Sequence, residues 1–471
     1  MQSNNKVRVS VFAVLVALAS ITAGCGSGSG SSNVQSNAAT SPVQVRLGDA
    51  PAGWIMAFSM NVNSITMKDN SGDTVNVLTS ATPMEMMNLM GTVQLLKMAN
   101  IPQGTYTQAT VNISPVSMGY MDPNTHQYVK KSLSGTYSGT VTFDPPMTVG
   151  TGSSVMSFDM NMASSVSIDS SGNVTITPTF TAMMNPTATS TQSPWQGYMQ
   201  NMVGLVSSSN GSQFTMTMLT GQQSVTVSTN SNTQFEGMGG MSGMSNGMIV
   251  SVDAITQPDG SLLAQNVESM ESSGGMMAGG FIGNITGTPA TGFTMATNSG
   301  IGGGMMMSNI ASTMTVNMSS GTTCSYDSTG VDLSNLPFNP NNFSTNCAIA
   351  KGQMIDVVSS SGMMSGGMGG GMMGGSTSNS IDATELRLEQ QGMHGTVSNY
   401  NGSSFTLTMP SDSAFATMTG TTTMIVYKQP GTQMLNTPAI SNGSQLEVRG
   451  LMFYDSGTYK MVASWIVTPT T

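Results

Sequence analysis

The chain repeats one stretch: Asn210-Gly-Ser-Gln-Phe-Thr-Met-Thr-Met218 returns as Asn401-Gly-Ser-Ser-Phe-Thr-Leu-Thr-Met409 and, more loosely, as Thr291-Gly-Phe-Thr-Met295. In the first copy apolar residues alternate with threonines, which is the period of a strand with one buried face. The Asn-Gly pair before it supplies the positive φ that a tight hairpin requires. Three copies of one turn and strand predict three copies of one small β domain.

Each copy lies among three other landmarks that recur in the same order. A short glycine-containing strand comes first, a turn with an apolar strand follows later, and a closing strand ends the unit. The openings are Val203-Gly-Leu-Val-Ser, Ile282-Gly-Asn-Ile-Thr and His394-Gly-Thr-Val-Ser; the later strands are 245–252, 350–357 and 441–448; the closing strands are 262–268, 381–389 and 459–467. Four matched elements, three times over, indicate tandem duplication.

The number of short strands in each unit, about five, predicts a small closed or partly open barrel of the OB kind. We place these three five-stranded, barrel-like repeats at 201–271, 281–391 and 392–469. The units resemble an uncharacterised bacterial repeat domain that commonly follows lipoprotein signals. No activity comes with that likeness.

Composition favours extracytoplasmic β-structure. Charged residues make up 7% of the 471 residues, against about 25% in an ordinary soluble domain, and Ser, Thr, Asn, Gln and Gly fill the polar positions. The length exceeds what one hydrophobic core can organise and predicts roughly three to five domains. We therefore expect an all-β chain, with an N-terminal β-sandwich ahead of the three repeats and Gly/Met-rich loops between strands.

The segment 43–184 has the period-two alternation of half-buried antiparallel strands, so we expect a β-sandwich. One short helix is expected within 84–98. The segment 185–200, rich in Pro, Ser and Thr, is expected to be a linker. The residues expected on buried faces are Val43, Val45, Leu47, Met56, Phe58, Met60, Val62, Met156, Phe158, Met160 and Met162, with Ser157, Asp159 and Asn161 outward.

Three motifs in this segment resemble the landmarks of an uncharacterised bacterial lipoprotein domain. They are Leu47-Gly-Asp-Ala-Pro51, Met84-Glu-Met-Met-Asn-Leu89 and Ile101-Pro-Gln-Gly-Thr-Tyr-Thr-Gln108. The family usually has Asp where Glu85 stands and Leu in place of the two methionines that follow. No catalytic residue comes with the resemblance, and we interpret the Asp-Ala-Pro motif as a turn.

Residues 1–24 are expected to be a signal peptide: Lys6 and Arg8 precede an apolar core that ends at the motif Thr22-Ala-Gly-Cys25. This end resembles a bacterial lipobox, with Thr22 where the family usually has Leu. The resemblance implies that the Cys25 thiol is lipidated and begins a tether over 25–42. An ordinary secretory signal is the alternative, and the core of about a dozen residues is short for a membrane span.

The expected location is therefore the cell envelope, with membrane attachment through the lipid. Gly26 after the lipidated cysteine favours the outer membrane where a cell has two membranes. Loss of Lys6 and Arg8 leaves ten basic and 22 acidic residues, a net charge near −12. Such a chain repels phosphates, so we expect no nucleic-acid partner. The sequence does not identify a protein or glycan partner.

The two remaining cysteines, Cys324 and Cys347, are expected to form a disulfide, because an even pair in an oxidising envelope favours one. The bond would close an insertion in the second repeat and constrain the unfolded chain by roughly 3 kcal/mol. A cysteine-based metal site is the weaker alternative. The chain has no C-x-x-C, and neither His126 nor His394 lies near the pair in sequence.

Methionine is the compositional anomaly, with 47 residues, more than twice the number of leucines. Soft thioethers on glycine-flanked loops are candidate ligands for Cu(I) or Ag(I), and a reversible oxidant sink is a further alternative. Against both, Met216 aligns with Leu407, which favours methionine as a replacement for leucine in the core. The candidate metal-binding residues are Met238, Met241, Met244, Met248, Met363, Met364, Met368, Met372 and Met373.

The motifs of common enzyme sites are missing from the sequence. The two histidines lie in different predicted domains, and no Gly-x-Ser-x-Gly motif or phosphate loop occurs. We therefore expect no catalytic residues and no obligate cofactor. The sequence favours a non-enzymatic, membrane-anchored envelope lipoprotein that acts as a structural or interaction module, with metal binding or oxidant scavenging by the methionine-rich loops as the alternative.

Overall fold

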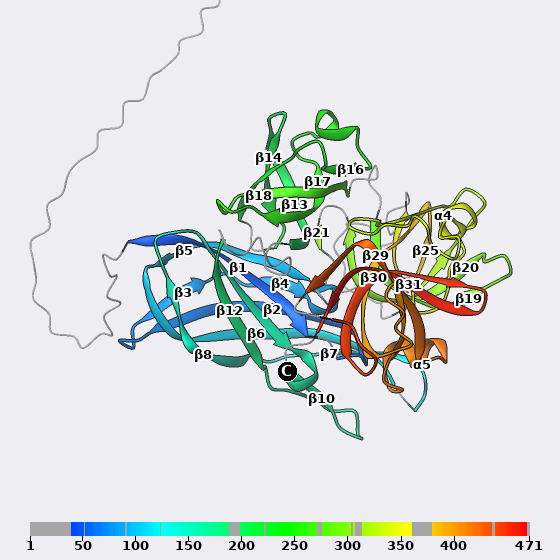
Figure 1. The fold of residues 1–471 in the computed structure, drawn as a ribbon, viewed down its shortest axis with the longest axis horizontal. Coiled ribbons are helices and arrows are strands. Elements are labelled where there is room, and N and C mark those ends of the chain that lie inside the picture. Colours follow the sequence, from blue (N-terminus) through cyan, green and yellow to red (C-terminus); the bar gives the residue numbers. More distant parts are fainter. Residues whose placement is uncertain are drawn as a thin grey trace, which may run out of the picture. The chain divides into compact units, whose positions relative to one another are not determined.

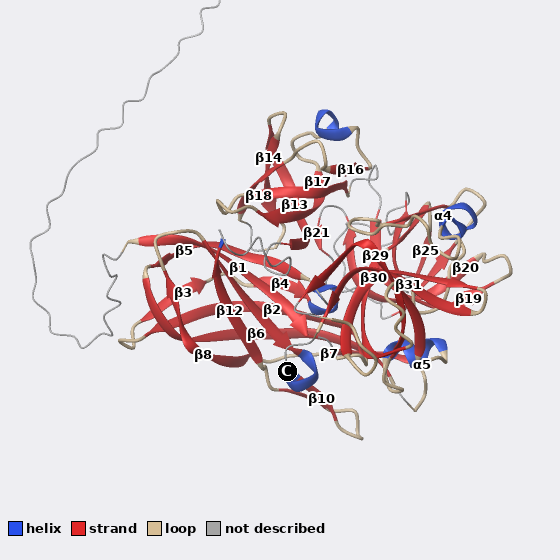
Figure 2. Cartoon of the chain, viewed as in Figure 1, coloured by secondary structure: helices blue, strands red, loops and turns tan. Residues whose placement is uncertain are grey.

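The computed structural model describes residues 39–50, 52–89, 92–122, 124–187, 198–220, 223–270, 276–302, 305–306, 313–359, 379–435 and 439–468. The chain divides into two units, Met1–Asn37 and Ala38–Thr471. The first unit lies outside the described residues, so the structure below is that of the second. Strands dominate it, as Figure 2 shows, and Figure 1 gives their labels.

The N-terminal domain is a β-sandwich, as expected. One sheet has the order β12 (Phe180–Pro186), β9 (Ser154–Asn161), β1 (Thr40–Ala50) and β5 (Val93–Pro102). The other has the order β3 (Thr74–Leu78), β2 (Ile55–Asp69), β6 (Gly104–Met121) and β7 (Tyr128–Ser132), with β4 (Thr82–Glu85) on β2 and β8 (Tyr137–Val149) on β6. A small hairpin, β10 (Val166–Ile168) with β11 (Val174–Ile176), follows the one-turn helix α1 (Met162–Ser165).

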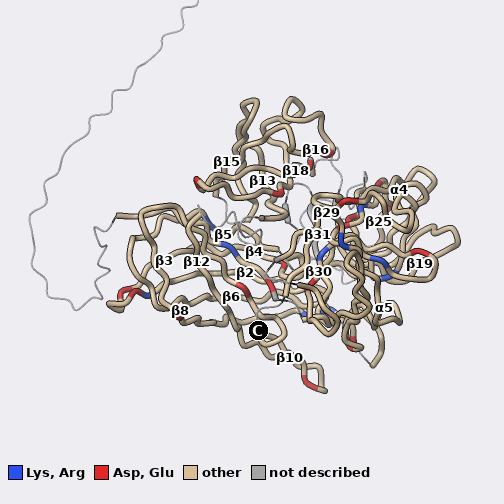
Figure 3. Tube along the Cα trace, in the orientation of Figure 1, with Lys and Arg blue, Asp and Glu red and all other residues tan. Residues whose placement is uncertain are grey.

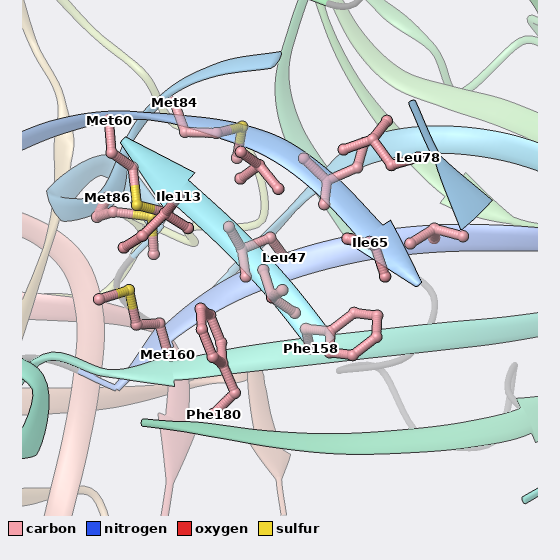
Figure 4. Packing of buried hydrophobic residues seen from close by; sticks show 14 of the residues in the cluster. Leu47, Met60, Ile65, Leu78, Met84, Met86, Ile113, Phe158, Met160 and Phe180 are labelled. Carbon is pink, nitrogen blue, oxygen red and sulfur yellow. The ribbon is translucent and has the colours of Figure 1, made fainter. Parts of the chain in front are cut away.

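The two sheets share one hydrophobic core. Leu47 and Phe158 come from one sheet, Ile65 and Ile113 from the other, and Figure 4 shows them packed together with the sulfur atoms of several methionines. All the residues expected on buried faces are buried. The alternation of the strands therefore predicted the core of this domain correctly.

Two expectations for the sandwich are wrong. The described residues of this range, 84–89 and 92–98, form no helix beyond the single 3₁₀ turn η1 (Met86–Leu89), because β5 pairs along its length with β1 and its backbone groups are satisfied there. The expected outward face of β9 is also incorrect: Ser157, Asp159 and Asn161 are half-buried. On β1 even Arg46 is buried, because residues of repeat 1 cover that face.

The first repeat is a ring of five strands with one short addition. It comprises β13 (Tyr198–Ser209), β14 (Gln213–Met218), β15 (Ser224–Ser228), β16 (Gln234–Glu236), η2 (Gly240–Gly243), β17 (Ile249–Thr256) and β18 (Leu262–Ser269). The sheet order is β15-β14-β13-β17-β18, and β15 also pairs in parallel with β18. That last pairing closes the ring.

The second and third repeats have the same strand order. Repeat 2 comprises β19 (Met276–Thr286), β20 (Gly292–Gly302), β21 (Met305–Met306), β22 (Thr313–Asn317), β23 (Thr323–Tyr326), α4 (Asn341–Asn346), β24 (Met354–Ser359), β25 (Ser380–Asp382) and β26 (Glu385–Leu388). Repeat 3 comprises β27 (Gln390–Ser398), β28 (Ser404–Thr408), α5 (Ala414–Thr419), β29 (Thr423–Leu435), β30 (Gln445–Asp455) and β31 (Thr458–Val467). The ring of repeat 2 differs from the closed barrel of repeat 3 in its last strand, which is broken into β25 and β26, and in the added strands β21 and β23.

Each ring closes where its third strand runs parallel to its last. The pairs at these closures are Val227 with Leu262, Val316 with Ile381, and Val426 with Met461. All six side chains are buried. An order of 1-2-3-5-4 with a parallel closing pair is that of the OB-like barrel expected from the sequence.

The repeated stretch that revealed the three units has the predicted conformation. Phe214, Met216 and Met218 of β14 point into the core of repeat 1, and Phe405 and Leu407 of β28 do so in repeat 3. The glycines of all four Asn-Gly pairs have positive φ, from +70° at Gly211 to +97° at Gly402. These turns therefore need glycine for conformational reasons.

Candidate functional site

The methionines of the loop 238–248 lie against the core of repeat 1. Met244 is buried, and Met238, Met241 and Met248 are partly buried apolar residues packed on the same cluster as Phe214. The loop contributes apolar surface to one end of the ring, which is the leucine-like role of methionine. Metal binding by these four residues stays a prediction.

The other sequence-predicted sites divide into two groups. Cys25 and the methionine cluster at 363–373 (Met363, Met364, Met368, Met372 and Met373) lie outside the described residues. Cys324 and Cys347 form a disulfide, with Cys324 on β23 and Cys347 at the end of α4. The bond closes the insertion 324–347 of repeat 2.

The structure brings that insertion next to a cleft on repeat 3 that sequence reasoning missed. The cleft has a volume of about 680 Å³, within the range of pockets that hold small organic ligands. Its walls come from three segments: the turn 401–404 between β27 and β28, residues 427–434 of β29, and Asn335 and Pro337 of the insertion. The turn and the third strand of an OB-like ring are the elements that bind oligonucleotides or oligosaccharides in such folds.

Backbone hydrogen bonds fix the floor of the cleft. The backbone N–H of Lys428 donates to the carbonyl of Ser403 at 2.8 Å, which joins the two walls. The Asn401 carboxamide oxygen accepts from the backbone N–H groups of Ser403 and Ser404 at 3.1 and 2.8 Å. At the bend in β29, the backbone N–H of Gln429 donates to Thr432 Oγ1 at 2.9 Å. The groups that line the cleft are therefore held in place without a ligand.

Three side chains of β29 keep their hydrogen-bonding groups free. Among the described residues, the Tyr427 hydroxyl, the Lys428 ammonium and the Gln429 carboxamide have no hydrogen-bond or ion-pair partner. They offer a hydroxyl, a cation and an amide within one short stretch. Polar groups that line a partly apolar cavity are typical of a site for a polar organic molecule.

A row of aromatic rings holds the insertion wall. The Phe338 ring lies 5.5 Å from Tyr427 and 5.5 Å from Phe453 between ring centroids, and Lys460 Nζ lies 4.9 Å above Phe338. Tyr427 is half-buried, so part of its ring remains available to a ligand. The disulfide joins the two ends of the insertion, and the aromatic row holds Phe338, which lies within it, against repeat 3.

Charge is sparse along the whole chain, as Figure 3 shows, and Lys428 is the charged side chain among those that line the cleft. Within the described ranges, no group of three or more His, Cys, Asp and Glu side chains is arranged to hold a metal ion. No helix in the part of the chain that the structure describes has the length and apolar character needed to cross a bilayer.

Buried charges lie instead between the repeats. Arg387 of β26 forms ion pairs with Glu236 and Glu268 of repeat 1 and contacts Glu389 at 3.4 Å. Burial raises the pKa of Glu268 to about 8. The Arg387 cluster thus joins two rings, and it lies apart from the residues of the cleft.

Comparison with known proteins is consistent with this division into domains. Residues 40–178 match the model of a domain of unknown function (DUF4382), and residues 203–268 match that of another domain of unknown function (DUF5666). No curated protein matches the chain. A multidomain protein with nucleic acid binding domains from Streptococcus pneumoniae TIGR4 is 11% identical over 56% of this chain and 72% of its own, with a TM-score of 0.11, and at that score the likeness carries no argument. The sequence expectation that both regions are domains of unknown function is confirmed.

Proposed function

We propose that this protein is a non-enzymatic binding module of the bacterial cell envelope, anchored through Cys25, whose repeat 3 holds an oligosaccharide. The observation that carries the proposal is the 680 Å³ cleft, with free polar groups on Tyr427, Lys428 and Gln429. A sugar ring presents hydroxyl groups that both donate and accept hydrogen bonds, together with an apolar C–H face. The cleft offers partners for both.

An oligosaccharide suits this cleft better than a nucleic acid. Both are ligands of OB-like rings, but nucleic-acid binding draws most of its affinity from phosphate neutralisation by several Lys and Arg residues. Here a single ammonium, that of Lys428, lines the cleft, and the chain carries a net charge of −10. Electrostatics therefore favours a ligand without a row of phosphates.

The insertion of repeat 2 has a role in this proposal. Asn335 and Pro337 form one wall of the cleft, and the Cys324–Cys347 bond with the Phe338 ring fixes that wall against β29. A preorganised wall lowers the entropy lost on binding. Repeat 2 thereby contributes to a site that its own ring does not contain.

Titration of the mature protein with a set of neutral and acidic oligosaccharides, followed by calorimetry, tests the proposal. Tyr427→Ala is expected to weaken binding by about tenfold or more, since it removes an aromatic contact and a hydroxyl. Tyr454→Ala is the matched control, because Tyr454 is exposed on β30 and does not line the cleft. Saccharide binding that is the same in both variants would place the site elsewhere, and no binding to any saccharide would contradict the proposal.

The anchoring part of the proposal is tested separately. The mature chain with Cys25→Ser is expected to move from the membrane fraction to the soluble fraction, because its acyl chains are the proposed attachment. Metabolic labelling with a fatty acid should mark the wild type and not the variant. A Cys25→Ser protein that stays with the membrane would refute the lipid anchor while leaving the cleft untouched.

A further inference from the structure

A second, smaller cavity lies where the sandwich, repeat 2 and repeat 3 meet. Its walls include Gly53 at the start of β2, Gly352 before β24, the β27 segment that ends at His394, and helix α5. The backbone N–H of Ala414 at the start of α5 donates to the Gly53 carbonyl at 2.7 Å, so the walls are joined directly. The cavity has a volume of about 60 Å³.

The lining of this cavity is rich in methionine thioethers. Three domains, the sandwich and repeats 2 and 3, bring thioethers to this one place, and no carboxylate or cysteine is among the lining residues. The methionines concerned are Met56, Met87, Met354, Met393, Met409 and Met418. Soft thioether ligands select monovalent copper and its analogues over the hard cations that require oxygen ligands.

His394 supplies a nitrogen donor to the same cavity. A Cβ atom placed on Gly53 would lie 3.6 Å from His394 Nδ1, in van der Waals contact, so the imidazole lies beside this glycine. Among the described residues the imidazole has no hydrogen-bond partner. Burial lowers the pKa of His394, with a smaller opposing effect from Asp412.

The other polar side chains of the lining, Gln391 and Ser413, already have partners, and Ser413 Oγ accepts from the Ala416 backbone N–H at 3.2 Å. The Gln391 carboxamide donates to the Gly352 carbonyl at 3.0 Å and accepts from the Met354 backbone N–H at 2.6 Å. The unsatisfied nitrogen of His394 is thus the polar feature that the packing leaves open.

The size of the cavity restricts what it can hold. Its volume of about 60 Å³ is far below the roughly 300–1,000 Å³ of pockets for organic ligands. It exceeds the roughly 30 Å³ that one water occupies in the liquid. A single metal ion fits, whereas an organic molecule does not.

We propose that this cavity, here named the His394 cavity, binds one soft monovalent cation, Cu(I) or its analogue Ag(I), through His394 and thioethers of the surrounding methionines. The binding is a coordination without redox change, and three or four neutral donors complete it. The site is distinct from the methionine-rich loops at 238–248 and 363–373 and from the saccharide cleft, and it rests on neither.

The test uses the full mature protein with Ag(I), which is redox-inert, and Cu(I) under anaerobic reducing conditions in competition with a chelator. Methionine ¹³C-methyl NMR identifies the residues that respond. We expect one ion at the tightest site, with shifts for methionines of the cavity. His394→Leu and the double variant Met354→Leu with Met409→Leu are expected to weaken that site by about tenfold or more, as loss of a supporting ligand does in metal proteins.

Two further variants test whether the ion binds in the cavity itself and not to buried methionines in general. Gly53→Val directs a side chain at His394 Nδ1 and is expected to abolish the tight site while every methionine remains. The double variant Met424→Leu with Met461→Leu removes two buried core thioethers of repeat 3 outside the cavity and should leave affinity unchanged. Circular dichroism and thermal unfolding verify that each variant folds. Wild-type affinity in Gly53→Val and His394→Leu, or shifts confined to the loop methionines, would overturn the proposal.

Discussion

The interiors of the three rings are apolar, whereas the junction between repeats 1 and 2 contains charged side chains. Inside the rings the buried side chains are aliphatic, aromatic or thioether groups, such as Phe405 and Leu407 in repeat 3. At the junction of repeats 1 and 2, Arg387 meets the carboxylates of Glu236 and Glu268. Charged residues make up 7% of the chain. Their concentration between two repeats therefore says more about how the domains are joined than the apolar ring interiors do.

This difference indicates which positions of the protein tolerate substitution. A ring interior needs volume and an apolar surface, so methionine and leucine exchange there with little loss. A buried ion pair needs both partners, because removal of one leaves a charge without compensation in a poorly solvated place. The rings should therefore accept conservative substitution, and the junctions should not.

Arg387→Ala tests the junction and has the largest expected effect. The change leaves Glu236, Glu268 and Glu389 facing one another without their shared cation. We expect the free energy of unfolding to fall by about 4 kcal/mol, measured by urea denaturation at neutral pH. Lys460→Ala, which removes an ion pair with the partly exposed Asp455 and a contact with the Phe338 ring, is the control and should change stability much less. Equal losses of unfolding free energy in the two variants would contradict the claim that the Arg387 junction is the more sensitive to substitution.

Leu407→Ala tests the interior of repeat 3 and should follow closely. Leu407 is fully buried in the ring, so truncation removes apolar contacts and leaves a cavity. A loss of about 3 kcal/mol in the free energy of unfolding is expected. Denaturation monitored by both circular dichroism and tryptophan fluorescence provides the measurement. A loss near zero would mean that Leu407 does not pack as described.

The pH dependence of stability sharpens the comparison, because it reports a buried carboxyl outside the Arg387 ion pairs. Burial, together with the nearby Asp159, raises the pKa of Glu447 to about 8. A glutamate titrates near pH 4.3 in an unfolded chain, to within about one unit. The folded state thus favours the protonated form, and this stabilisation is complete at acid pH and lost as pH rises through about 8.

We therefore expect the protein to be about 2 kcal/mol less stable at pH 8.5 than at pH 5.5, measured as urea midpoints in matched buffers. Glu447→Gln should flatten the dependence, since the amide has no charge to desolvate. Stability that instead increases over this range would show that the Glu447 carboxyl is ionised and stabilised in the folded state.

Met216→Leu has the smallest expected effect and tests the interior again. Leu407 occupies the matching position of repeat 3, and both residues are fully buried. The substitution should change the free energy of unfolding by less than about 1.5 kcal/mol in either direction. A larger loss would show that the thioether at this position does more than fill space.

Local pattern was enough to predict the rings. The alternation in the stretch from Asn210 to Met218 fixes one buried face, the Asn-Gly pairs fix the hairpins, and three copies fix the number of units. The closing parallel pairs, such as Val426 with Met461, are long-range contacts without a local signature. An OB-like order was nevertheless expected, since five short strands of this length have few ways to bury one face.

The contacts between domains were beyond sequence reasoning. Arg46 appears in an alternating strand where a charged residue normally points to solvent, yet repeat 1 covers it and Thr256 accepts its hydrogen bond. The same limit hid the cleft of repeat 3, because Asn335 and Tyr427 belong to different repeats. No sequence pattern linked His394 to the methionines, whereas the structure places it among methionines from three domains.

The most direct test of the account is a parallel binding measurement on the wild-type mature protein. Neutral oligosaccharides and a single-stranded oligonucleotide of similar length are titrated at low salt, the condition most favourable to phosphate binding. We predict saccharide binding that Tyr427→Ala weakens by about tenfold and no binding of the oligonucleotide. Oligonucleotide binding without saccharide binding would contradict the assignment of the cleft and of the function.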